Sequence, residues 1–212
     1  MKTENDYGKA EEFFCGMKSQ RRIQRKSLSL FPEVPEERIF MLSEKEITEG
    51  FEDYKKFRHL YLTAFPKEER VPAKYLMKHN DESELIACYD GETFCGFYST
   101  LTFGDITHIL FLAIAENLRD HGYGSQILRL VSARYPGNRI ILDIEAEDPS
   151  APNAEQRTKR RAFYERNGYT DSGIAYEWKG VPYRILIRNG SISKAEFDAF
   201  WDNLDEVRRK EM

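Results

Sequence analysis

One segment near the middle of the chain restricts the possible folds more than any other. Ile106 to Ala115 is almost entirely apolar, as expected of a central strand covered on both faces. It leads into Arg119-Asp120-His121-Gly122-Tyr123-Gly124, where two glycines stand at the predicted start of a helix. Unpaired N–H groups and the helix dipole attract anions at such a start, and glycine permits close approach. The segment therefore predicts a strand–turn–helix phosphate site.

The turn alone does not identify the anion. An ATP-type loop requires GxxxxGK followed by Ser or Thr, and a dinucleotide fingerprint requires a third glycine, where this chain has Ile127. Neither template is met. A helix opened by glycines for packing alone is the alternative interpretation of these residues.

The first half of the chain predicts helices and an antiparallel strand pair. Arg38 to Leu42 could form a first strand, and apolar residues recur at helical spacing between Phe51 and Phe65. A second helix could begin at Pro72. Two strands follow, joined through the turn dipeptide Asp90-Gly91, at residues 84–89 and 93–101.

The second half continues with alternating helices and strands. The expected elements are a helix at 124–135, a strand at 139–146, a helix at 155–167, strands at 169–178 and 183–188, and a final helix capped by Ser193 with Glu196. The order predicts a mixed α/β domain over residues 38–190. Residues 1–37 form an N-terminal appendage, and residues 191–212 a C-terminal helix packed on the domain.

Composition excludes several classes of protein. The 212 residues suit one domain, and no apolar stretch approaches the roughly 20 residues of a membrane span. The N-terminus lacks the pattern of a secretory signal, so we expect a soluble cytoplasmic protein without membrane contact. A net charge of -4 argues against nucleic-acid binding and fits a cationic substrate better. The cysteines and histidines show no metal-ligand spacing, so no metal site is expected.

Two motifs together resemble a known family. Arg119 to Gly124 resembles the Arg/Gln-x-x-Gly-x-Gly/Ala signature of the GNAT superfamily of N-acetyltransferases, and the apolar strand before it lies where that family places one. Downstream, Ala162 to Tyr169 looks like the family's FYxxxGF segment. The resemblance covers roughly residues 38–188. It implies a mostly antiparallel twisted sheet with flanking helices, a splayed central strand pair that holds the cofactor, and acetyl-CoA as donor.

The resemblance also implies which residues hold the cofactor. The family's asparagine near the cofactor arm is replaced here by Arg157, and Asn153 could serve if a local insertion brings it into place. Basic residues from Arg157 to Arg161 could reach the 3′-phosphate of CoA or form a solvated helix face. The implied cofactor-binding residues are Leu112, Ala113, Ile114, Arg119, His121, Gly122, Tyr123, Gly124, Ser125 and Asn153.

Amine acetylation needs a base for the ammonium proton and an acid for the departing thiolate. By resemblance Tyr164 is the acid, Glu145 is the candidate base, and Glu69 lies where the family binds the acceptor amine. Glu69 or a chain of waters could replace Glu145 as base. The expected acceptor is a primary amine of a small molecule or peptide, and the protein a monomer or homodimer. The alternative is a non-catalytic CoA or acyl-CoA sensor, which an exposed Phe200 or Trp201 would favour.

Overall fold

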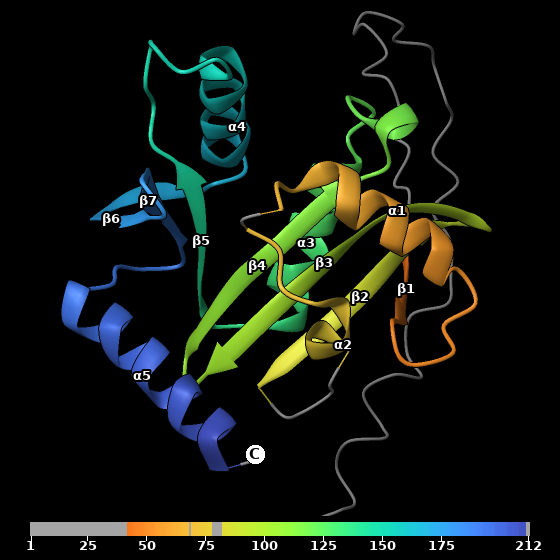
Figure 1. Ribbon diagram of the computed structural model, residues 1–212, viewed down its shortest axis with the longest axis horizontal. Coiled ribbons are helices and arrows are strands. Elements are labelled where there is room, and N and C mark those ends of the chain that lie inside the picture. Colours follow the sequence, from red (N-terminus) through yellow and green to blue (C-terminus); the bar gives the residue numbers. More distant parts are fainter. Residues whose placement is uncertain (1–41, 68, 78–81, 211–212) are drawn as a thin grey trace, which may run out of the picture. The chain divides into compact units, whose positions relative to one another are not determined.

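A computed structural model of the protein describes residues 42–67, 69–77 and 82–210, with side chains as far as residue 203. These residues form a seven-stranded sheet in the order β1-β2-β3-β4-β5-β7-β6, with helices packed on it (Figure 1). The β4–β5 pair is parallel, and the other neighbouring pairs are antiparallel. The fold class expected from the sequence, a mixed and mostly antiparallel sheet with flanking helices, is confirmed.

The elements predicted from residue 51 onward are confirmed, with ends shifted by a few residues, whereas the strand at residues 43–46 was not predicted. The turn after the second strand consists of Gly91 and Glu92, one residue later than expected, because Asp90 still pairs with Thr93. Gly91 supplies the positive φ of 58° that the turn requires. The predicted strand at 38–42 and the appendage at 1–37 lie outside the described residues, apart from Leu42. The strands are β1 (Ser43–Glu46), β2 (Ser83–Asp90), β3 (Thr93–Phe103), β4 (Ile106–Ile114), β5 (Arg139–Glu145), β6 (Thr170–Trp178) and β7 (Val181–Arg188). The helices are α1 (Tyr54–Ala64), α2 (Ala73–Leu76), α3 (Tyr123–Arg134), α4 (Ala154–Arg166) and α5 (Lys194–Lys210), with a 3-10 turn η1 (Glu116–Leu118).

Helices cover both faces of the sheet. On one face, Phe57 and Tyr61 of α1 pack with Phe97 and Phe111 of the central strands. On the other face, α3 buries its stripe of Ile127, Leu128 and Val131, which belongs to the same cluster as Tyr98 and Leu142. These stripes repeat every three or four residues, so the helical spacing in the sequence predicts which side chains are buried.

The last helix closes one end of this arrangement. Phe197 and Phe200 of α5 join a cluster with Ile141 and Ile185, on the face opposite α3. The helix begins with the predicted capping box, because the Ser193 backbone N–H donates to the Glu196 carboxylate at 2.8 Å and the Glu196 N–H donates back to Ser193 Oγ at 3.2 Å. Arg139 Nη1 also contacts Glu196 at 2.7 Å, which ties α5 to the start of β5.

The central strands β4 and β5 separate partway along their length. β4 pairs with β3 over Ile106–Ile114, but with β5 only over Ile106–Ile109 (Figure 1). The separation begins at a β-bulge: Ser99 stands opposite Phe111 and Thr100 opposite Ile109, so Leu110 is an extra residue in β4. Beyond it, the β4 edge that faces β5 pairs with none of the strands described. This is the splayed pair that the family resemblance implies.

Candidate functional site

A cleft of about 1860 Å³ opens where β4 and β5 separate and continues to α5. Drug-sized ligands occupy roughly 300–1,000 Å³, so this cleft has room for a large cofactor and a second molecule together. We distinguish two sides. The turn side comprises Leu112, Ala113, Ile114, Arg119, Gly122, Gly124 and Ser125, and the aromatic side comprises Phe65, Glu69, Phe111, Tyr176 and Tyr183.

The turn side has the geometry of an anion site. Gly122 precedes α3 with φ 85° and ψ -4°, a left-handed conformation that glycine adopts without strain, and no side chain caps the helix. The first helical hydrogen bond runs from Gln126 N–H to the Gly122 carbonyl at 3.2 Å. The N–H groups of residues 123–125 therefore lack helical partners, and Gly124 and Ser125 line the cleft.

The two sequence motifs meet at Gly124. A Cβ added there would lie 3.0 Å from Cζ of Phe163, so the absence of a side chain lets α3 and α4 approach closely. Two other predicted turn residues direct their side chains elsewhere: His121 Nδ1 contacts the Arg119 carbonyl at 2.7 Å, and the Tyr123 hydroxyl donates to Asp90 at 2.8 Å. Only the backbone of these two residues is left for a cofactor.

Tyr164 lies on α4 with its ring against Phe163 and Tyr169, at centroid distances of 5.0 and 5.7 Å. It lines the cleft, and its hydroxyl forms no hydrogen bond with any residue that the structure describes. Burial raises the pKa of Tyr164 to about 12. At neutral pH the phenol therefore retains its proton and can donate it to a ligand.

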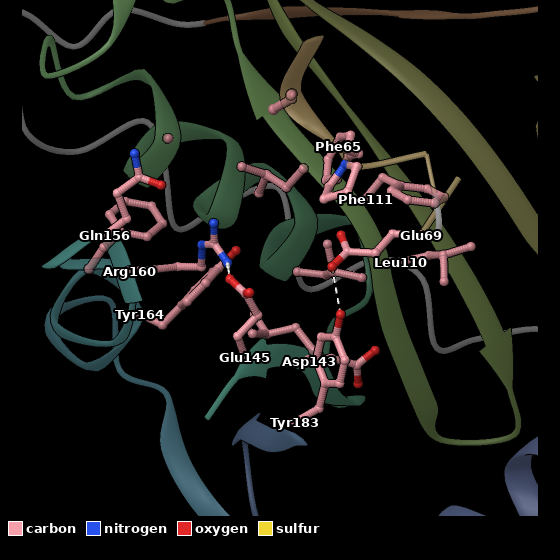
Figure 2. Close-up of a pocket in the computed structure, with 18 of the residues that line it drawn as sticks. Phe65, Glu69, Leu110, Phe111, Asp143, Glu145, Gln156, Arg160, Tyr164 and Tyr183 are labelled. Atoms are coloured by element: carbon pink, nitrogen blue, oxygen red, sulfur yellow. Dashed lines mark hydrogen bonds and ion pairs between the residues drawn. The ribbon is translucent and has the colours of Figure 1, made fainter. Parts of the chain in front are cut away.

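Glu145, the predicted base, is engaged with three donors. Asn153 Nδ2 lies 3.1 Å from Oε2 and Arg157 Nη2 3.0 Å from Oε1. Arg160 Nη1 lies 2.9 Å from Oε2 (Figure 2). The Arg157 side chain also donates to the Ala146 carbonyl at 2.8 Å. The cluster fastens the start of α4 to the end of β5. Asn153 lines the cleft, but its amide is bonded to Glu145.

The aromatic side presents one carboxylate, that of Glu69, among aromatic rings. The Tyr183 hydroxyl donates to Glu69 at 2.5 Å, its ring stacks on Tyr176 at 5.4 Å, and Phe65 meets Phe111 edge-on at 4.8 Å (Figure 2). Burial and the neighbouring Glu69 raise the pKa of Tyr183. In the described part of the chain Glu69 has no Lys or Arg partner, so its negative charge is available to a cation. Aromatic faces attract cations as well.

Asp143, Tyr176 and residues of α5 also line the cleft, although they were not predicted as site residues. Asp143 lies two residues before Glu145 on β5, and residues two apart share a face of a strand. The acidic residue inside the otherwise apolar run Ile140–Ile144 could therefore have indicated a second carboxylate on the face of β5 that carries Glu145. Nothing in the sequence indicated that Tyr176 or Trp201 would reach the same cleft, because they belong to elements far along the chain.

Comparison with known proteins agrees with this geometry. Residues 81–171 match the acetyltransferase (GNAT) domain family, in agreement with the family that the sequence resembles. The match supports an acyltransferase. None of the curated proteins matches the sequence. None of the helices described is long and apolar enough to cross a membrane.

Solved structures share the fold at low sequence identity. A Bacteroides thetaiotaomicron protein assigned to the GNAT acetyltransferases aligns at a TM-score of 0.65 with 20% identity, over 76% of this chain and 95% of that one. The ribosomal-protein-S18-alanine N-acetyltransferase of Escherichia coli gives 0.54 with 14% identity, over 72% and 96%. An aminoglycoside 6'-N-acetyltransferase in complex with coenzyme A gives 0.52 with 17% identity, over 69% and 96%.

Proposed function

We propose that the protein transfers the acetyl group of acetyl-CoA to a primary amine of a small molecule or peptide by direct attack. One observation carries the proposal: an unpaired stretch of the β4 edge, an uncapped helix start and a free tyrosine hydroxyl line the same cleft. A strand-like arm, a pyrophosphate and a leaving thiolate are the three parts of acetyl-CoA that these groups suit.

The donor occupies the turn side in this proposal. The N–H groups of residues 121–125 bind the pyrophosphate, with Arg119 beside them. Main-chain groups of Leu112 and Ile114 pair with the pantetheine amides as an added strand would. Lys159 and Arg160 line a second hollow of about 450 Å³ next to Asp120, within reach of an exposed 3′-phosphate.

The acceptor occupies the aromatic side. Glu69 with Tyr183 attracts an ammonium group, and the rings of Phe65 and Phe111 contact its carbon skeleton. After the neutral amine attacks the thioester carbon, Tyr164 protonates the thiolate. A monomeric or homodimeric state and a cytoplasmic location remain predictions.

The test combines binding and turnover. Titration calorimetry with near-millimolar acetyl-CoA should detect binding, and thiol release should rise above the acceptor-free rate for at least one member of an amine panel. Competition between acetyl- and succinyl-CoA would then fix the acyl group. A chain that binds no acetyl-CoA at this concentration would refute the proposal.

The alternative function, a non-catalytic CoA or acyl-CoA sensor, has less support from the structure. An exposed Phe200 or Trp201 would have favoured it, but Phe200 is 1% exposed and Trp201 packs edge-on against His108 at 5.3 Å. Binding of acetyl-CoA without turnover of any amine would restore this alternative.

A further inference from the structure

A buried histidine–aspartate pair lies at the point where β4 and β5 separate. His108 of β4 is fully buried, and its Nε2 lies 3.2 Å from Oδ1 of Asp143 on β5. Asp143 is the first β5 residue beyond the β4–β5 pairing, which ends at Leu142. Its side chain is 21% exposed and lines the cleft. The carboxylate therefore stands between a sealed interior and the open site.

Asp143 differs from Glu145 in what surrounds its charge. Both oxygens of Glu145 accept from Arg side chains, at 3.0 and 2.9 Å. Asp143 has no Lys or Arg partner among the described residues; its hydrogen-bond partner is His108. A substrate ammonium would have to displace an arginine from Glu145, but it meets an uncompensated charge at Asp143.

The surroundings of His108 favour one tautomer of its imidazole. Nδ1 is buried and has no hydrogen-bond partner within the described residues, while the rings of Phe200 and Trp201 stand edge-on to the imidazole at 6.2 and 5.3 Å. The tautomer with hydrogen on Nε2 donates to Asp143 and leaves an unpaired acceptor at Nδ1. The other tautomer would bury an unpaired donor at Nδ1 and present a lone pair to the carboxylate.

We propose that Asp143 takes the proton from the acceptor ammonium and that His108 is the positioning residue that orients its carboxylate from the buried side. The inference rests on the proposed function. The ammonium gives one proton to Asp143 and becomes a neutral amine. The amine nitrogen then bonds to the acetyl carbon as the carbon–sulfur bond breaks. The thiolate takes the second nitrogen proton by way of Tyr164, and Asp143 releases its proton to solvent.

The mechanism predicts a pH signature for Asp143→Asn. At pH 7 kcat should fall about 100-fold, because amide oxygen is a poor proton acceptor. The deficit should shrink as pH rises towards the acceptor's own pKa, and it should be small for an acceptor whose amine is already neutral at pH 7. The ionisable groups around Asp143 that the profile must account for are His108, Tyr164, Tyr176, Tyr183, Glu69, Glu145, and Lys194 with Asp198 across the cleft.

Asp171→Asn is the control, because Asp171 of β6 is similarly exposed, at 20%, but pairs with Arg161 of α4 and Arg184 of β7 and lies outside the cleft. It should keep the wild-type rate. Glu145→Gln should lower the Tm more than Asp143→Asn does and slow turnover less. Equal losses in Asp143→Asn at every pH and with every acceptor would mean a structural role and overturn the inference.

His108 is tested by rescue. His108→Leu should lower kcat about tenfold with little change in the acceptor KM, and His108→Gln, whose amide nitrogen can replace the Nε2 donor, should recover most of the rate. Thermal melting identifies a misfolded variant, and Asp143→Asn then decides alone. An active wild type with an unimpaired Asp143→Asn overturns this inference and spares the proposed function. A wild type that binds acetyl-CoA but acetylates no amine overturns both.

Discussion

The two sides of the cleft are built by different means. The turn side comes from residues 112–125, which are neighbours in the chain, and it offers mainly backbone groups: a free strand edge and an uncapped helix start. The aromatic side gathers side chains from residues as distant as Phe65 and Tyr183. Backbone sites tolerate few changes of shape, whereas side-chain sites change with single substitutions. The donor half of such an enzyme should therefore be fixed and the acceptor half adjustable.

The largest expected effect tests how far the turn side depends on close backbone approach. A Cβ at Gly96 would lie 2.2 Å from the Ala113 carbonyl oxygen, so Gly96→Ala should force β3 from β4 and lower the free energy of unfolding by about 3 kcal/mol. Urea denaturation measures it. Gly91→Asn is the control, because that turn position has open space and asparagine accepts its φ of 58°. Equal destabilisation by the two changes would contradict the argument.

A second prediction separates chemistry from binding at the boundary of the two sides. Tyr164→Phe should lower kcat about 100-fold and leave the acetyl-CoA dissociation constant nearly unchanged, because only the hydroxyl meets the thiolate. Thiol release and calorimetry measure the two quantities. Tyr169→Phe is the neighbouring control: its buried hydroxyl has no partner in the described residues, so its removal should preserve the rate. An unchanged kcat in Tyr164→Phe would exclude the acid role.

A third prediction concerns the aromatic side alone. Glu69→Gln still accepts from Tyr183 but loses its charge, so the acceptor KM should rise about tenfold, the difference between a charged and a neutral hydrogen bond. The acetyl-CoA KM should not move. Glu92→Gln, in the exposed turn after β2, should change neither constant. Parallel rises in both KM values would show that the two sides are not independent.

The smallest effect concerns the attachment of α5, which closes the aromatic end. The Ser193 backbone N–H and the Arg139 guanidinium lower the pKa of Glu196 from 4.5 to about 2. The stabilisation is complete above pH 4.5 and disappears as the pH falls towards 2. Glu196→Gln should therefore flatten the dependence of Tm on pH within that window, as thermal melts would record. A variant whose Tm still falls as steeply as wild type would disprove the linkage.

Local signals explain what could be predicted from the sequence. The glycine turn, the Phe163-Tyr164 segment and the Ser193–Glu196 capping box are each set by residues a few positions apart, and the structure has all three. The arginine pairs of Glu145 depend on how α4 packs against the end of β5, and the contact of Asp143 with His108 depends on the register of β4 with β5. Period-two spacing on β5 could reveal the shared face of Asp143 and Glu145, but not which carboxylate an arginine would occupy.

The bulge at Leu110 changes which face of the sheet the following side chains of β4 occupy. Side chains on a strand normally alternate, so Ile109, Phe111 and Ala113 would share one face. Instead Ile109 packs in the α3 cluster, and Phe111 and Ala113 pack in the α1 cluster. A single additional residue thus exchanges the α3 face and the α1 face of the sheet for the side chains in the rest of the strand. Since every residue concerned is apolar, the hydropathy of the sequence does not reveal the exchange, and we expect deletion of Leu110 to turn the Phe111 side chain away from the cleft.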